Sequence, residues 1–216
     1  MGNALALLYA LSAALVVPGY DHVGGHDGVE VYARKDPNRI ELMTVGDIAA
    51  PPEAVQAVLL DYANASRITK HLAESTILSR TGSELVVYQH LKLPVVKDRD
   101  YTLRVSWSDT KRSLHFAIAP DQGPAPKKNM VRMPVMTGRW DLLPLEGGRA
   151  TRAVYHVEID FGGSVSHGMV RSGSAKSLPD MYVGIRREAA KPKHFASSAP
   201  ALSPEEKERV EGVLGN

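Results

Sequence analysis

From residue 29 onward, apolar and polar residues alternate in short runs that are separated by turn residues. This period-two pattern is typical of antiparallel strands with one face in a core. The first two runs, 29–34 and 40–49, flank Asp36-Pro37-Asn38, where proline presets the first turn dihedral and asparagine tolerates the next one. Six further strands are predicted at 75–80, 84–91, 101–107, 113–119, 139–145 and 151–161, and a short one within 131–135.

Helical patterns interrupt this series once and then end it. Pro51-Pro52-Glu53 opens a first helix, because proline is tolerated in the first helical turn. Its apolar residues recur at helical spacing: Ala54, Val55, Val58, Leu59 and Tyr62. A second short helix is predicted over 68–72 and a long one over 164–187. Pro179 is expected to kink or split the long helix, which also contains Gly168, Gly173 and Gly184.

The chain is long enough for one domain with a sizeable core and terminal extensions. It has 216 residues, of which 44% are hydrophobic and 23% are charged. We place the domain at 27–189, between an N-terminal apolar segment, 1–26, and a tail, 190–216. Residues 190–200 have the composition of a flexible linker, and Ser203-Pro204-Glu205-Glu206 resembles a capping box that starts a short charged helix.

The N-terminal segment has the length of a secretory signal. Residues 4–17 are apolar except for Ser12, a run too short to span a bilayer comfortably, but no Lys or Arg precedes it. Because of the length and apolar character of this run, we expect export to the periplasm or the extracellular space. A membrane anchor, an N-terminal helix packed on the domain and a misplaced start codon are the alternatives.

Charge and motif content exclude several classes of function. Lys and Arg number 26 against 24 Asp and Glu, which leaves a net charge of +2, too small to favour nucleic acid as a partner. The absence of cysteine excludes disulfides, thiolate nucleophiles and thiolate metal sites. His22 and His26, near Asp21 and Asp27, form only a weak metal signal. With no nucleotide or hydrolase motif, the sequence predicts no cofactor, no metal and no catalytic set.

The order of strands and helices, together with four local sequences, resembles the bacterial START-domain lipid-transfer proteins of the Bet v 1-like (SRPBCC) superfamily. The similar segments span about 27–188 and are Asp27-Gly28-Val29-Glu30-Val31-Tyr32-Ala33-Arg34, Ile48-Ala49-Ala50-Pro51-Pro52-Glu53-Ala54-Val55, Val86-Val87-Tyr88-Gln89 with Asp98-Arg99-Asp100-Tyr101, and Val131-Arg132-Met133-Pro134-Val135 with Gly138-Arg139-Trp140. The resemblance implies an α+β helix-grip fold, in which a curved antiparallel sheet wraps a long C-terminal helix around an apolar tunnel.

The resemblance also implies a gate and a function. The loop 92–98, with Leu93, Pro94, Val95 and Val96, would close the tunnel together with the C-terminal helix. Arg99 and Asp100 would form a structural ion pair that pins this loop. We expect a monomeric, non-enzymatic carrier or sensor of a lipid or other hydrophobic molecule, with transient membrane contact.

Alternation along the strands predicts the residues that line this tunnel. Val86 and Val105 occupy the positions where sterol-carrying relatives often have a charged pair, which indicates a more apolar interior. In 84–91 both faces are largely apolar, and the resemblance favours Val86, Tyr88 and His90 as inward. The predicted lining is Val86, Tyr88, His90, Tyr101, Leu103, Val105, Leu114, Phe116, Trp140, Leu142, Tyr155, Val157 and Ile159 from the strands, with Met169 and Met181 from the helix.

Three other functions fit the same pattern. Aromatases and cyclases on this fold use an Arg, Tyr or His in the tunnel, so an enzyme would need a polar pocket with several ionisable groups. A quinone-binding chaperone would share the apolar interior. A scaffold would act through the charged tail, 190–216, and would lose its function when that tail is deleted.

Overall fold

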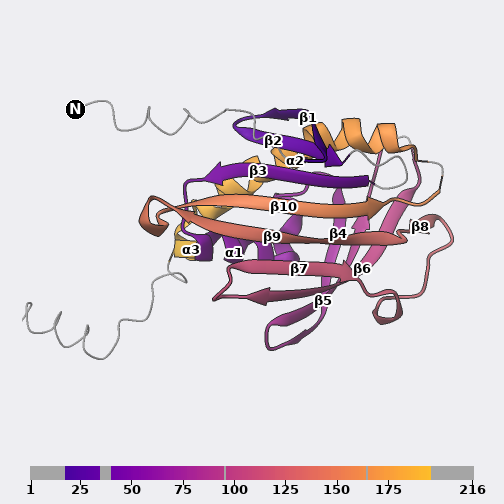
Figure 1. Cartoon of the computed structure of the whole chain (residues 1–216). Coiled ribbons are helices and arrows are strands. Elements are labelled where there is room, and N and C mark those ends of the chain that lie inside the picture. Colours follow the sequence, from indigo (N-terminus) through magenta and orange to yellow (C-terminus); the bar gives the residue numbers. More distant parts are fainter. Residues whose placement is uncertain (1–17, 35–39, 95, 164, 196–216) are drawn as a thin grey trace, which may run out of the picture.

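The structure, a computed structural model, describes residues 18–34, 40–94, 96–163 and 165–195. These residues form one curved sheet with a long helix across one face (Figure 1). The strand order is β1-β2-β3-β10-β9-β7-β6-β5-β4, and β8 adds to β6 in parallel. The strands are β1 (Tyr20–His26), β2 (Val29–Arg34), β3 (Ile40–Ile48), β4 (Leu72–Thr81), β5 (Glu84–Leu91), β6 (Asp98–Ser108), β7 (Ser113–Ile118), β8 (Met130–Arg132), β9 (Val135–Leu145) and β10 (Ala150–Asp160).

The helices lie at two points of the chain, between β3 and β4 and after β10. They are α1 (Pro52–Leu60), η1 (Tyr62–Arg67), α2 (His167–Ala189) and α3 (Pro192–Phe195), with single 3-10 turns η2 (Pro120–Gln122) and η3 (Glu146–Gly148). The predicted α+β class, with a curved antiparallel sheet and a C-terminal helix, is confirmed. Every predicted strand is present, with ends shifted by a few residues.

Four predictions about the secondary structure were wrong. The first strand, β1, lies inside the predicted N-terminal segment and pairs with β2, so the sheet begins at Tyr20. The second short helix is η1 rather than 68–72, because Leu72 already pairs with Leu91 in the sheet. Helix α2 continues through Pro179, which is buried, so packing outweighs the missing backbone donor. The predicted linker contains α3.

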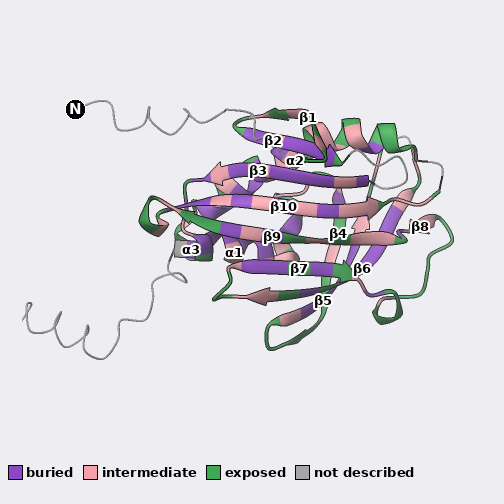
Figure 2. Ribbon diagram, viewed as in Figure 1, coloured by how far each residue is buried: buried purple, intermediate pink, exposed green. Residues whose placement is uncertain are grey.

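One buried apolar cluster joins the concave face of the sheet to α1 and α2 (Figure 2). The alternation predicted for β6, β7, β9 and β10 is confirmed, since these inward residues belong to the cluster: Tyr101, Leu103, Val105, Leu114, Phe116, Trp140, Leu142, Tyr155 and Val157. Each strand thus presents every second side chain to the helix side.

Tyr182 fixes α2 to the middle of this face. Its ring lies 5.4 Å from that of Trp140, which in turn stacks on Tyr155 at 4.5 Å. Its hydroxyl lies 3.0 Å from the carbonyl oxygen of Thr44 and 3.1 Å from that of Ala153. The ring needs the bare backbone of Gly46, where a Cβ atom would come within 2.9 Å of Tyr182 Cδ1. Aromatic packing and a satisfied hydroxyl therefore act together at this contact.

A second close contact holds the same half of α2 against η1. A Cβ atom on Gly184 would approach the Cα atom of Ile68 to 2.8 Å. Gly173 lies in the same helix, closer to its N-terminus. Nothing lies within 4 Å of a Cβ atom built on that residue. Both glycines have a helical backbone, but only Gly184 is in close contact with another element. Gly173 is therefore a suitable control for a substitution at Gly184.

We predict that Gly184→Ala lowers the free energy of unfolding by about 1 to 3 kcal/mol, because the methyl group overpacks a backbone contact. Gly173→Ala should raise it by up to about 1 kcal/mol through helix propensity alone. Urea denaturation followed by circular dichroism measures both changes. Equal effects of the two substitutions would contradict the close approach of α2 to η1.

Candidate functional site

One end of the sheet leaves its apolar face only partly covered. Several strand ends meet at this edge because of the antiparallel register. They are the ends of β5, β7 and β10 and the starts of β6 and β9, and α2 also begins there. Six apolar side chains at this end pack on the core yet stay partly exposed: Leu93, Ile118, Met136, Ile159, Phe161 and Val165. We call this set the apolar mouth.

Arg99 connects the two loops that border the apolar mouth. Its side chain is 2% exposed, and on β6 it points to the same face as Tyr101. The guanidinium donates to the carbonyl oxygen of Phe161 at 3.2 Å, to that of Gly162 at 3.1 Å, and to that of Lys97. Arg99 thereby ties the β5–β6 loop to the β10–α2 loop.

The predicted ion pair between Arg99 and Asp100 was wrong, because neighbours on a strand point to opposite faces. Asp100 lies on the convex side, where it accepts from Arg132 at 2.8 and 2.9 Å and from the Tyr88 hydroxyl at 3.2 Å. Hydrogen bonding to Asp100 raises the pKa of Arg132. Arg99 and Asp100 therefore form bonds on opposite faces of the sheet.

The inward face predicted for β5 was also wrong. Val86, Tyr88 and His90 lie opposite Arg104, Thr102 and Asp100 of β6, on the convex face. The interior side of β5 instead carries Leu85, Val87, Gln89 and Leu91. The apolar residues of the convex face are buried because the chain between β7 and β8 covers them. Lys127 lies over the Tyr88 ring at 5.4 Å, and a Cβ atom at Gly123 would meet the Thr102 hydroxyl.

The interior does hold several polar groups. The Tyr101 hydroxyl donates to Gln89 Oε1 at 2.9 Å, and Gln89 Nε2 donates to Ser75 at 3.0 Å. Tyr155 lies deeper, between Trp140 and Phe116. Tyr62 packs on the same core from η1. Burial raises the pKa of all three tyrosines, so their hydroxyls stay neutral.

Tyr62 and Gln89 were missing from the predicted lining. Tyr62 was visible in the sequence as the last member of the helical stripe that begins at Ala54. Gln89 was lost because the inward face of β5 had been assigned to the wrong set of alternate residues.

The long helix covers the sheet unevenly. Between His167 and Ser177 Val170 is the one buried residue, and Met169 is 50% exposed, so its predicted inward position was wrong. Val170 takes the inward position instead. Met181, further along, packs on the core as predicted. The N-terminal half of α2 thus has few buried contacts, and such segments open more readily than their surroundings.

The loop predicted to act as a gate borders the apolar mouth. Leu93 packs against the core, Val96 is partly buried and Pro94 is exposed. Val95 lies outside the described residues. The position of this loop agrees with a gate, while its movement stays a prediction.

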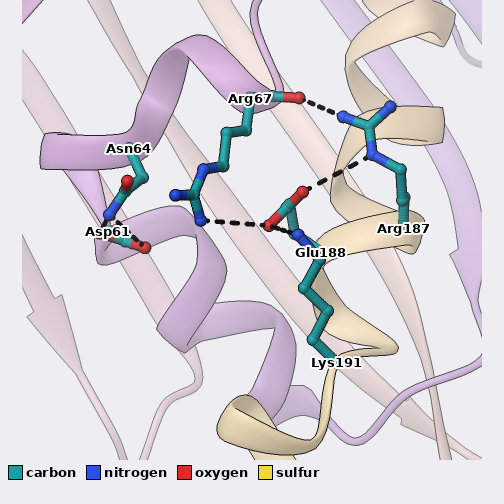
Figure 3. A network of polar contacts seen from close by, with 6 residues as sticks. All are labelled: Asp61, Asn64, Arg67, Arg187, Glu188 and Lys191. Atoms are coloured by element: carbon teal, nitrogen blue, oxygen red, sulfur yellow. Dashed lines mark hydrogen bonds and ion pairs between the residues drawn. The ribbon is translucent and has the colours of Figure 1, made fainter.

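A polar network anchors the opposite end of α2 (Figure 3). Glu188 is 5% exposed and accepts from Lys191 at 2.6 Å, with Arg187 at 3.6 Å and Arg67 at 3.8 Å. The hydrogen bond from Lys191 holds the pKa of Glu188 below its usual value. Arg186 also donates to the carbonyl oxygens of Asp47 and Asp27, at 2.9 and 2.6 Å. The C-terminal half of α2 is therefore tied to both η1 and the sheet.

Two hollows lie beside this network. One is an open groove of about 240 Å³ between η1 and α2, lined by residues that include Lys70, Asp180 and Val183. The other, of about 10 Å³, lies between α1, η1 and Glu188. Neither is the interior tunnel predicted from the sequence, which stays a prediction.

Other predictions fall on parts of the chain with limited description. The apolar run 4–17 and the capping box at 203–206 lie outside the described residues. Within the described part, no helix is both long and apolar enough to cross a bilayer.

His22 pairs with Glu30 at 2.6 Å, and His26 pairs with Asp27 at 2.9 Å and Asp180 at 3.3 Å. These contacts tie β1 to β2 and to α2.

Residues 48–182, more than half of the chain, match the model of the family described as polyketide cyclase / dehydrase and lipid transport. The chain belongs to this family. No curated protein sequence matches it.

Solved structures with the same fold include lipid-transfer proteins and one enzyme. A STAR-related lipid transfer protein from Xanthomonas axonopodis is 21% identical, with a TM-score of 0.69 over 80% of this chain and 99% of that one. Human STARD10 is 20% identical, with a TM-score of 0.70 over 87% and 82% of the two chains. The Zhui aromatase/cyclase from Streptomyces sp. R1128 is 16% identical, with a TM-score of 0.50 over 73% and 92%. The fold is thus that of START proteins.

We predict that Arg99→Lys loosens both loops at the apolar mouth, because one ammonium group cannot bridge three carbonyl oxygens in the same geometry. Amide hydrogen exchange should accelerate about tenfold in 92–97 and 161–163, while that of β3 and β9 stays unchanged. Arg104→Lys, on the same strand with an exposed partner in Glu84, is the control. Unchanged exchange at both loops would contradict the proposed link.

Proposed function

We propose that this protein binds a hydrophobic small molecule, such as a lipid or sterol, between the concave face of the sheet and α2, for transfer or sensing. The ligand enters at the apolar mouth. The β5–β6 loop and the N-terminal half of α2 move aside to admit it. No chemical step is part of this function.

The observation that carries the proposal is that the two halves of α2 differ in how many buried contacts they make with the rest of the protein. Its C-terminal half is fixed by Tyr182, Gly184 and the Glu188 network. Its N-terminal half, up to Ser177, buries only the side chain of Val170 and is otherwise held by contacts with the edge strands, such as the hydrogen bond from Arg171 to the carbonyl oxygen of Arg34. The side chains of the apolar mouth at this end of the sheet include Ile159 and Met136. Burial of one large apolar group gains about 1.5 to 3 kcal/mol, so an apolar ligand would compensate for the contacts it displaces.

Fold membership also supports this proposal, since several proteins of the same fold are lipid-transfer proteins by name. The aromatase/cyclase neighbour makes an enzyme the second candidate. Catalysis by acid and base needs ionisable groups within reach of one another in the pocket. In the described interior the Tyr101 hydroxyl is bonded to Gln89 and the Arg99 guanidinium to backbone carbonyl oxygens, which favours binding over catalysis.

Native mass spectrometry of the purified full chain tests the proposal directly. We expect a mass increment that disappears on extraction with organic solvent and corresponds to an apolar compound in the extract. The extract identifies the ligand class. A protein without any bound compound that also fails to take up an apolar fluorescent probe would overturn the proposal, and turnover of an aromatic polyketide would favour the enzyme.

A substitution at the apolar mouth gives a second prediction. Ile159→Arg should weaken binding of an apolar fluorescent probe at least about tenfold, because entry and burial would require desolvation of an unpaired charge. His156→Arg, on the opposite face of the same strand, should leave the affinity unchanged. Thermal denaturation verifies that both variants are folded. Equal affinities of the two variants would place the binding site elsewhere.

A further inference from the structure

The open groove of about 240 Å³ between η1 and the C-terminal half of α2 is lined mainly by positive charge. Three of the four charged residues that line it are cations: Arg67, Lys70 and Arg187. The fourth, Asp180, already lies 3.3 Å from Nε2 of His26. We call this hollow the η1–α2 groove. Its excess of positive charge favours an occupant that carries carboxylates or other anionic groups.

The two guanidinium groups of the groove retain donors for such an occupant. The side chains of Arg67 and Arg187 are 47% and 61% exposed. They lie 3.8 and 3.6 Å from the carboxylate oxygens of Glu188, whereas the ammonium group of Lys191 is bonded to that carboxylate at 2.6 Å. Because each guanidinium has five N–H donors and Lys191 is the close partner of Glu188, both arginines can bind a further anion.

The η1–α2 groove also has an apolar part. Val183 lines it and is 38% exposed. On α2, Val183 follows Asp180 by three residues and precedes Arg187 by four, so these side chains share one face of the helix. Ile68 lines the groove from the opposite side. A fitting occupant therefore combines acidic with apolar side chains.

The described part of the chain ends close to this groove. The smaller hollow shares the wall residues Arg67 and Ile68 with the groove, and it is also lined by His194, one residue before that end. The segment 196–202, when fully extended, reaches at most about 25 Å. The groove follows two turns of α2, or roughly 10 Å. A segment that begins at Ser203 can therefore reach the groove.

The tail has the composition that the groove requires. Ser203-Pro204-Glu205-Glu206 predicts the start of a helix, and 205–211 contains four glutamates, one lysine, one arginine and one valine. Glu206 and Val210 are four residues apart, so they share a face of the predicted helix. A helix of this length is only marginally stable alone in water, and it needs a surface on which to pack.

We propose that residues 203–211 bind in the η1–α2 groove of the same chain. Glu206 lies at the cations and Val210 covers Val183. This inference goes beyond the proposed function and does not depend on it. An exposed ion pair alone is weak, but the short link 196–202 raises the effective concentration of the tail into the millimolar range. Binding at this groove stabilises the C-terminal half of α2 and leaves the apolar mouth uncovered.

Amide hydrogen exchange of the full chain tests this inference. We expect slower exchange in 204–211 than in a free peptide of the same sequence. Lys70→Glu should accelerate this exchange about fivefold, because it replaces an attractive charge by a repulsive one. Glu206→Lys combined with Lys70→Glu should restore the slow exchange. Lys70 is exposed and lies outside the Glu188 network (Figure 3), and circular dichroism verifies that the variant is folded.

Lys111→Glu is the matched control, since it makes the same charge change at an exposed lysine in the turn between β6 and β7. It should leave exchange in 204–211 unchanged. Exchange of 204–211 at the rate of the free peptide, or equal acceleration by both lysine variants, would overturn the inference. Protection that is lost on dilution would also overturn it, in favour of the tail of a second copy.

Discussion

The packing of Tyr182 on Gly46 is the contact on which the arrangement of this fold depends. It joins the long helix α2 to β3, and it places two backbone carbonyl oxygens within reach of a hydroxyl that would otherwise be buried alone. Trp140 and Tyr155 extend the contact across the sheet. The concave face is thereby divided into a region filled by aromatic rings and a region that ends at the apolar mouth.

This division gives the two halves of α2 different roles. The C-terminal half is part of the core, with Glu188 and Arg186 bonded to η1, β3 and the β1–β2 turn. The N-terminal half covers the apolar mouth with few buried contacts. Arg99 holds the loops beside it through backbone oxygens alone, so this link does not depend on the identity of the side chains in those loops.

The sequence was sufficient for the fold and for most of the interior. Strands with one polar face, such as β6, β7 and β10, showed their inward residues by alternation. Strand β5 did not, because the chain between β7 and β8 buries its convex face as well, and Val86 and Tyr88 are as apolar as Val87. The ion pair of Asp100 with Arg132 joins residues 32 positions apart, a separation that local patterns do not reveal. Met169 was misplaced because helical spacing alone did not give the rotation of α2.

The two glycine contacts of α2 also restrict how the helix moves. At Gly46 the ring of Tyr182 lies on bare backbone, and at Gly184 the helix backbone itself lies on Ile68. Sliding along the helix axis would drive Cβ-bearing neighbours into both contacts. Rotation of α2 about these two contacts displaces the opposite end of the helix most. A small change of angle at residues 182–184 would therefore move His167 a long way from the sheet. The length of the helix between these points therefore sets how far its N-terminal end is displaced by a given rotation.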